Sequence, residues 1–194
     1  MSPSNHFVAS WLVGALTTNN SRDRKLVTLA GLLPDLDGLG IIVDMISEKL
    51  PGRHFELYQR YHHYVSHGWP GALVICGALT LFAKDRWRTF GWCLVTFHLH
   101  LLCDFVGSRG ETAQDLWPIA YGEPLFRNPV FVWTSQWPLD GWQNMVFFSV
   151  VLFLSLLVAR KKGVSFLEFF GRAVDSRFVK WLRVGTRYHV DETV

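Results

Sequence analysis

Hydrophobic positions along the chain gather into runs that are separated by short polar segments. One uncharged apolar run, residues 141–159, contains 19 residues and ends at the basic cluster 160–162. Only this run approaches the ~20 residues that a membrane-spanning helix needs. Shorter apolar runs occupy residues 7–16, 26–33, 69–83 and 90–103. The pattern predicts an all-α fold, a polytopic or membrane-embedded helical bundle. Its shorter runs are tilted spans, half-inserted helices or core helices, and the run at Trp69 reaches span length when it is extended back through Tyr61.

A different pattern follows residue 162. Apolar side chains recur at helical spacing with basic side chains between them: Phe166, Leu167, Phe170, Val174, Phe178, Trp181 and Leu182, with Arg172, Arg177, Lys180 and Arg183. This predicts a basic amphipathic helix that lies on a membrane surface or docks on a partner protein. The alternative is an ordinary packed C-terminal helix. We therefore divide the chain into a membrane-associated domain, 1–160, and a basic tail, 161–194.

The basic residues are distributed unevenly among the connecting segments. Three short loops, 22–25, 84–88 and 160–162, carry nine Lys and Arg residues, whereas segments 44–68 and 104–140 together carry five. The positive-inside rule places the three basic loops in the cytoplasm. The chain then zigzags through the membrane, and its C-terminal tail is cytoplasmic.

Composition narrows the class of protein further. The 194 residues suit one domain, with 18% charged residues, 15% aromatic residues and a net charge of +3. The low charge and the positive mean hydropathy of +0.17 exclude a disordered tail protein and a basic nucleic-acid-binding module. Membrane lipids are the expected partners, and nucleic acid is not. The three cysteines form no CxxC pair, so we expect no disulfide framework.

Several ionisable residues border the apolar runs, where they are energetically costly and mark functional sites. They are His6, Asp35, Asp37, His62, His63, His67, His98, His100 and Asp104. The zigzag rests on loop charges alone, yet it sends all of these residues to the outer side of the membrane. This agreement predicts a single site there.

Residue type and spacing favour a metal centre. His100 and Asp104 are four residues apart, so they share one face of a helix and can bind one cation together. His63 and His67 have the same spacing, whereas His62 and His67 converge only if a helix begins between them. Imidazole and carboxylate without thiolate suit zinc, or a manganese- or iron-like ion.

Two carboxylates, Asp35 and Asp37, lie on a helix break that is created by Pro34 and Gly38. They can bridge two metals, or hold and deprotonate a water molecule. A bound metal lowers the pKa of its water toward ~7 and so supplies a hydroxide nucleophile. Metal-assisted hydrolysis is therefore the reaction class that needs the fewest additional assumptions.

Each feature also has a purely structural interpretation. The histidine–aspartate pair can be a hydrogen bond in the core, the two aspartates can cap a following helix, and the histidine doublet can lie at the membrane interface. His98 alternates with His100 and faces elsewhere, so we expect a structural role for it. His54 and His189 lie in charged surroundings and are assigned no role.

The order of these motifs, across residues 1–160, resembles the inner-membrane-associated, metal-dependent hydrolases (YdjM-like). The motifs are an N-terminal His6, then Leu33-Pro34-Asp35-Leu36-Asp37, His62-x-x-x-Ser66-His67 and His100-x-x-x-Asp104. That family is similar in turn to the all-helical zinc-dependent phospholipases C and single-strand nucleases. The resemblance implies that seven residues are metal ligands or water-activating groups: His6, Asp35, Asp37, His62, His67, His100 and Asp104. Where the family has Arg after its first motif histidine, this chain has His63.

We therefore expect a hydrolase of the inner membrane that cleaves a lipid or lipid-linked phosphoester with one or two zinc ions, and with its site on the periplasmic side. In this hypothesis Asp37 is a bridging ligand or general base, and His6 binds a second ion. Arg109, in the turn 107–110 after the ligand helix, is the expected phosphate clamp, although a solvated turn is the alternative. A rival hypothesis is a non-enzymatic membrane scaffold with a structural metal. A metal or proton carrier would need the same residues near the middle of the bilayer, which the loop charges disfavour.

Overall fold

The computed structural model describes residues 1–50, 55–58, 62 and 66–184. The all-α prediction is confirmed, because helices dominate and the one sheet is tiny. The helices are α1 (Pro3–Thr17), α2 (Ser21–Ala30), η1 (Leu33–Leu39), α3 (Gly40–Ser47), α5 (Trp69–Thr80), α6 (Arg86–Gly107), α7 (Trp142–Lys162), η2 (Phe166–Phe169) and α8 (Arg172–Val184). The sheet pairs β1 (Ile119–Ala120) with β2 (Val130–Phe131) in antiparallel register.

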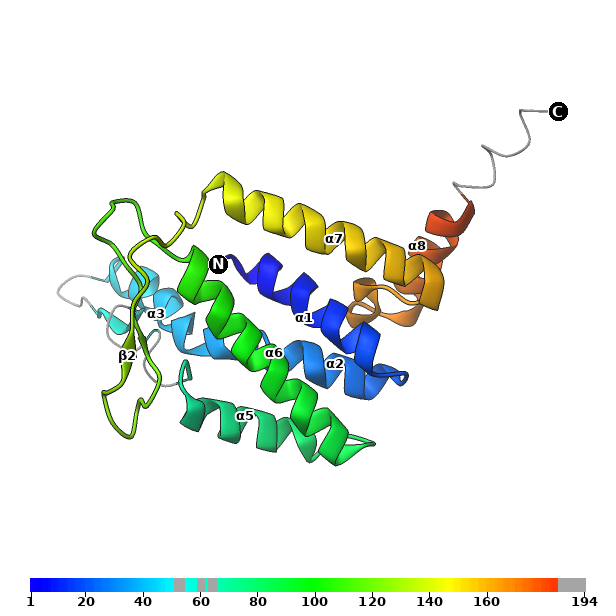
Figure 1. Cartoon of the computed structure of the whole chain (residues 1–194), viewed down its shortest axis with the longest axis horizontal. Helices are drawn as coiled ribbons and strands as arrows, with labels where there is room; N and C mark the ends of the chain where they lie inside the picture. Colours follow the sequence, from blue (N-terminus) through cyan, green and yellow to red (C-terminus); the bar gives the residue numbers. More distant parts are fainter. Residues whose placement is uncertain (51–54, 59–61, 63–65, 185–194) are drawn as a thin grey trace.

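The long helices form a bundle in which α1 packs on α2 and α7, while α6 packs on α1, α2 and α5. Successive helices run in opposite directions across the view of Figure 1. As a result, the start of α1, the end of α2, the start of α5 and the end of α6 gather at the end of the bundle that also carries the sheet. The loop between α1 and α2 and the loop between α5 and α6 lie at the opposite end.

At the end of the bundle opposite the sheet, hydrogen bonds to polar side chains fix where the helices begin. The Asn20 side chain accepts the main-chain N–H of Asp23 and so caps α2. The Asp23 carboxylate accepts the main-chain N–H groups of Lys84 and Asp85, at 2.8 and 3.1 Å, which ties α2 to the start of α6. The helix α7 ends at Gly163, whose φ of 75° is the left-handed conformation that favours glycine at a helix C-terminus.

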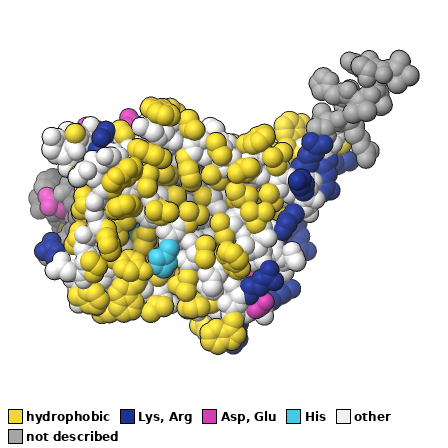
Figure 2. Space-filling model, viewed as in Figure 1, with side chains coloured by type: hydrophobic (Ala, Val, Ile, Leu, Met, Phe, Trp, Pro, Cys, Tyr) yellow, Lys and Arg dark blue, Asp and Glu magenta, His cyan; other side chains and the backbone are white. Residues whose placement is uncertain are grey.

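The core between α2, α5 and α6 is built from small and aromatic side chains around Phe97, which is fully buried. All three cysteines are buried there or nearby, and all are free. Outside this core the surface is strongly apolar, and Figure 2 shows hydrophobic side chains over most of the face that is presented by α6 and α7. In the same view, Lys and Arg side chains concentrate at the end from which α8 projects.

Helix lengths differ from those that the apolar runs predict. In the part of the chain that the structure describes, two helices, not one, are long and apolar enough to cross a membrane: α7 and the 22-residue α6, which continues beyond its apolar run through Arg86 and Gly107. The run at Trp69 does not continue back beyond Gly68 as one helix, because Gly68 is extended and α5 begins at Trp69 with 12 residues; Tyr61 lies outside the described residues. The pair α2 and η1–α3 reaches span length only as a broken helix with a bend of 51°.

The predicted amphipathic helix over 166–182 is interrupted. Residues 166–169 form the separate 3-10 helix η2, and α8 begins only after Gly171, whose φ of 131° breaks the helix. The break is stabilised by Asp175, which accepts both the main-chain N–H and the hydroxyl of Ser165, at 2.8 and 2.6 Å.

Glu168 in η2 fastens this segment to the bundle. Its carboxylate is buried and forms an ion pair with Arg24, in which the guanidinium Nη2 donates at 2.7 Å. The Trp11 indole N–H and the Ser21 hydroxyl donate to the same carboxylate, at 3.2 and 2.7 Å. The oxygen atoms of Glu168 are therefore satisfied by donors from α1 and α2, so the tail begins as part of the bundle.

We predict that Glu168→Gln destabilises the protein strongly, because it leaves the buried Arg24 guanidinium without a counter-charge. Loss of one partner of a buried ion pair costs about 3–5 kcal/mol. Thermal unfolding in detergent measures the effect, and Glu111→Gln on an exposed loop is the matched control. Equal unfolding temperatures for the two variants would contradict this account of the tail.

Candidate metal centre

Seven of the ionisable residues singled out in the sequence meet at the end of the bundle that carries the sheet: His6, Asp35, Asp37, His62, His67, His100 and Asp104. They arrive from five separate segments, which are α1, η1, the turn at residue 62, the segment before α5, and the last turns of α6. Four of them come together tightly: Asp35, His67, His100 and Asp104 each offer one ligand atom, and these atoms all lie within 4.8 Å of one another. Each of these four residues was a predicted metal ligand.

The spacing of these ligand atoms fits a tetrahedral ion. The His100 Nε2 atom lies 3.0 Å from Asp104 Oδ2 and 3.5 Å from Asp35 Oδ1. The His67 Nε2 atom lies 3.3 Å from His100 Nε2 and 3.8 Å from each of the same two carboxylates. Ligand atoms at zinc-like bond lengths of ~2.0–2.1 Å in a tetrahedron are about 3.3 Å apart.

The two histidines are held with their Nε2 atoms toward the cluster. The His100 Nδ1–H donates to the main-chain carbonyl of Gly31 at 3.0 Å. The His67 Nδ1 atom is hydrogen-bonded to Asp37 Oδ2 at 3.1 Å. Metal-binding histidines commonly donate their second ring N–H to a carbonyl or a carboxylate, which fixes the tautomer and orients the ring. Both rings are therefore preorganised as Nε2 ligands.

The local sequence explains how these groups approach one another. Gly31 lies so close to α1 that an added Cβ would be 1.9 Å from Ser10 Oγ, so only glycine brings its carbonyl to His100. Pro34 stands in the first turn of η1. The Ser66 hydroxyl donates to the Pro34 carbonyl at 2.5 Å, which holds the segment before α5 against η1.

The donor atoms of the cluster suit a cation, and the Met1 ammonium already pairs with Asp104 Oδ1. Asp104, His67 and His100 are almost fully buried, and the Asp35 side chain is 27% exposed. Among the described residues, Asp35 Oδ2 and the Nδ1 atom of the neighbouring His6 are buried without a hydrogen-bond partner. Buried polar atoms without partners are unusual in proteins and ask for a specific explanation. The donor set and these unpartnered atoms fit a zinc-class ion.

Comparison with known proteins identifies the chain. Residues 1–166 match the YdjM inner membrane protein family. The chain belongs to that family. No curated protein and no solved structure matches it. Family membership and the apolar helices α6 and α7 make it an inner membrane protein. The further similarity to phospholipases C and nucleases stays a prediction.

The remaining predicted site residues of this YdjM family member form a layer around the four. Asp37 faces away from the cluster, because its carboxylate bonds to both His67 and His62, the latter at 2.9 Å. His6 stacks on His100 with ring centroids 3.8 Å apart, and its Nε2 lies 3.1 Å from Asp104 Oδ1. The structure therefore places Asp37, His62 and His6 where they orient or neighbour the four central residues.

Several other sequence expectations concern residues outside this layer. His98 faces away from the cluster, as expected, and its Nε2 bonds to the Tyr121 hydroxyl at 2.7 Å. Arg109 follows the site along the chain, and its Nε is buried without a hydrogen bond among the described residues. His63, His54 and His189 lie outside the residues that the structure describes.

Three residues that contact the site were not assigned to it from the sequence: Met1, whose ammonium pairs with Asp104 Oδ1, Ser108 and Trp117. The Ser108 hydroxyl donates to Asp104 Oδ1 at 2.8 Å, and the Trp117 ring packs edge-on against His62, with centroids 5.4 Å apart. Ser108 is four residues after Asp104, the spacing that places two side chains on one helix face, so the signal was present. Trp117 reaches the site through a loop, and no spacing rule could place it there.

We predict that the purified protein binds stoichiometric zinc or manganese and that His100→Ala abolishes this binding. Asp37→Asn should keep the site but weaken its metal affinity about 10–100-fold, because it releases the orientation of His67. Elemental mass spectrometry and a competitive chelator titration measure both effects. His98→Ala, on the same helix, is the control and should bind metal as the wild type does. Metal loss in His98→Ala equal to that in His100→Ala would contradict the assignment.

Metal binding should also release a proton. Burial of the His67 imidazole lowers its pKa, but the nearby carboxylates of Asp35, Asp37 and Asp104, of which Asp37 is hydrogen-bonded to the ring, outweigh burial and raise this pKa to about 9. The metal-free imidazole is therefore protonated at pH 7, and an ion must displace that proton. Apparent metal affinity should rise about tenfold per pH unit from pH 7 toward 9. Calorimetric titration in buffers of different ionisation enthalpy counts the proton, and an affinity independent of pH would contradict this account.

Proposed function

We propose that this protein is a membrane-bound, metal-dependent hydrolase that cleaves a phosphoester. The observation that carries the proposal is the cluster of two imidazoles and two carboxylates, in which Asp35 alone is partly open to solvent. A zinc-class ion bound there would polarise a phosphoryl oxygen and supply a hydroxide at neutral pH. Asp35, His67, His100 and Asp104 would hold the ion, and the substrate would approach from the side of Asp35.

Asp35 is the best-placed proton acceptor. One of its oxygens faces His100 and the other has no hydrogen-bond partner among the described residues. Asp37, expected to bridge metals or act as the base, instead has both oxygens engaged with histidines. We therefore assign Asp37 as a positioning residue that keeps His67 in its ligand tautomer, and Asp35 as the group that takes the proton from the attacking water.

Arg109 is the proposed phosphate clamp. It directly follows Ser108, whose hydroxyl bonds to Asp104, and its Nε is buried without a hydrogen bond in the described part of the chain. A guanidinium fits a phosphate with two parallel hydrogen bonds and keeps its charge at all physiological pH values. An anionic substrate at the metal centre would satisfy this group.

The proposed orientation in the membrane follows the charges. The basic residues of the three loops lie at the end opposite the metal centre, which favours a cytoplasmic location for that end and a periplasmic one for the site. The exposed basic residues Arg177 and Lys180 and the exposed Trp181 of α8 suit contact with anionic lipid headgroups or with a protein partner. A lipid or lipid-linked phosphate is the proposed substrate class.

A second candidate is a non-enzymatic membrane scaffold with a structural metal. Four protein ligands in a tetrahedral arrangement are typical of closed structural sites, whereas catalytic zinc sites keep one position for water. The partial exposure of Asp35 and the buried Arg109 Nε, which has no hydrogen bond among the described residues, favour the hydrolase, since a structural site needs neither.

Hydrolysis by the zinc-loaded protein in detergent, with bis(4-nitrophenyl) phosphate and a phospholipid as probes, distinguishes the two candidates. Arg109→Ala should lower kcat/KM about 100-fold while it keeps the metal, because it removes only the charge that faces the phosphate. Arg127→Ala, on an exposed loop, is the control with an unchanged rate. A fully metal-loaded wild type that hydrolyses neither probe would overturn the hydrolase and favour the scaffold.

A further inference from the structure

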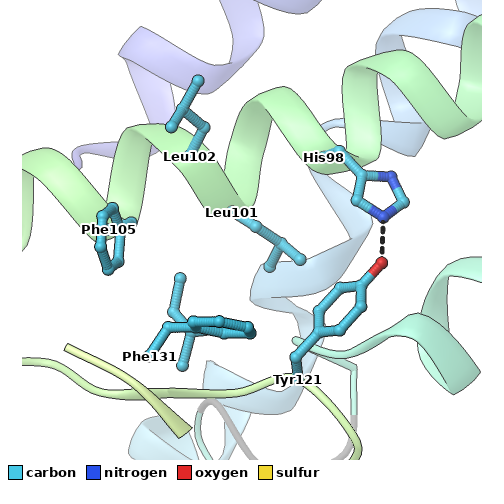
Figure 3. Close-up of a pocket in the computed structure, with 7 residues that line it drawn as sticks. His98, Leu101, Leu102, Phe105, Tyr121 and Phe131 are labelled. Atoms are coloured by element: carbon cyan, nitrogen blue, oxygen red, sulfur yellow. Dashed lines mark hydrogen bonds between the residues drawn. The ribbon is translucent and has the colours of Figure 1, made fainter. Parts of the chain in front are cut away.

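A cavity of about 230 Å³ lies between α6 and the two-stranded sheet. Figure 3 shows side chains of α6 along one side of it and Tyr121 and Phe131 from the region of the sheet on the other. Its lining residues are His98, Leu101, Leu102, Phe105, Ile119, Tyr121 and Phe131. It is separate from the four-residue metal cluster, whose His100 and Asp104 occupy the buried face of the same helix.

Most of the side chains in the wall of this cavity are apolar. Its two polar side chains, His98 and Tyr121, satisfy each other, because the tyrosine hydroxyl and the His98 Nε2 are 2.7 Å apart (Figure 3). The His98 Nδ1–H donates to the Leu94 carbonyl at 2.8 Å, so both ring nitrogens are engaged. A cavity whose polar atoms are already paired gives water too few partners and stays dry or takes an apolar ligand.

The surroundings of the cavity indicate that it faces the hydrocarbon chains of the membrane. Leu102 on α6 and Phe131 on β2 are 56% and 47% exposed, and α6 is long and apolar enough to span the membrane. In an inner membrane protein, the medium against such a helix face is the lipid chains. Leu101 lies six residues before the end of α6, a depth of about 9 Å along the helix axis at 1.5 Å per residue. Trp133, which stacks on Phe105 at 6.4 Å, suits the interface above it.

One short segment joins the cavity to the metal centre. Trp117 packs against His62 at the edge of the site, while Ile119 and Tyr121, two and four residues later, form part of the cavity wall. Extended chain advances about 7 Å over two residues. A ligand that lies along this segment would therefore have one end beside the metal centre and the other inside the cavity.

We propose that this cavity binds an acyl chain of a membrane phospholipid whose phosphate group lies at the metal centre, so that the hydrolase acts on a lipid phosphoester. The position of the phosphate rests on the proposed function, whereas chain binding rests on the cavity alone. The dry wall selects a hydrocarbon chain, and the opening on the lipid-facing side of α6 lets the chain enter from the bilayer without leaving it.

The test uses the full protein in lipid nanodiscs that contain a phospholipid with a photoreactive diazirine on its acyl chain. After illumination, peptide mass spectrometry should find the label concentrated in residues 98–105 and 119–131. Phe131→Gln makes the exposed wall polar and should lower labelling there at least about fivefold, because an amide facing hydrocarbon is costly. Val130→Gln, at the similarly exposed neighbouring position that does not line the cavity, is the control and should label as the wild type does.

Labelling spread evenly over the exposed faces of α6 and α7, or equal labelling of the two variants, would overturn the proposal. An activity measurement separates its two parts. Phe131→Gln should raise the KM for a long-chain phospholipid and leave that for bis(4-nitrophenyl) phosphate unchanged. If labelling falls as expected but no phosphoester is hydrolysed, the acyl-chain site stands and the hydrolase fails. If both KM values stay unchanged in an active enzyme, the chain in the cavity is not that of the substrate.

Discussion

The structure depends on how two buried imidazoles are oriented. His100 is fixed by the Gly31 carbonyl and His67 by the Asp37 carboxylate, and both rings consequently direct Nε2 at Asp35 and Asp104. Burying two carboxylates and two imidazoles together is unfavourable unless a cation or protons balance the charge. The antiparallel order of the helices, the break at Pro34 and the missing side chain at Gly31 all serve to bring these groups from distant segments to one point.

Buried charged groups lie at both ends of the bundle, but their charges are balanced differently. At one end, the buried charge of Glu168 is neutralised by Arg24 and by hydrogen bonds from Trp11 and Ser21, so that end is electrically complete. At the other end, Asp35 and His6 keep unpartnered buried atoms among the described residues. These unpartnered atoms fit a cation that Asp35, His67, His100 and Asp104 could hold.

Much of this arrangement could be predicted from the sequence, for identifiable reasons. Helix formation and the four-residue spacing of His100 and Asp104 depend only on residues that are close in the sequence. The apolar runs therefore predicted the helices, and the spacing predicted that the two side chains share one helix face. The alternation of basic loops gave the direction of successive helices, and hence the end at which the ionisable residues meet. The sequence could not show which of these residues bind the metal and which only orient the ligands. His62 and His67 lie outside regular helix, and the Asp37 carboxylate is oriented by its hydrogen bonds to both. The helix break at Gly171 depends on Asp175 reaching back to Ser165, a contact that helical periodicity does not encode.

The central claim is that two histidines and two aspartates from three separate segments, η1, the segment before α5 and α6, bind one metal ion. X-ray absorption at the zinc edge of the zinc-loaded protein tests it most directly, since it reports ligand type and distance without reference to any activity. The account predicts a first shell of only nitrogen and oxygen at about 2.0–2.1 Å, with the outer-shell scattering of two imidazoles. A sulfur ligand at about 2.3 Å, or a shell without imidazole, would contradict it.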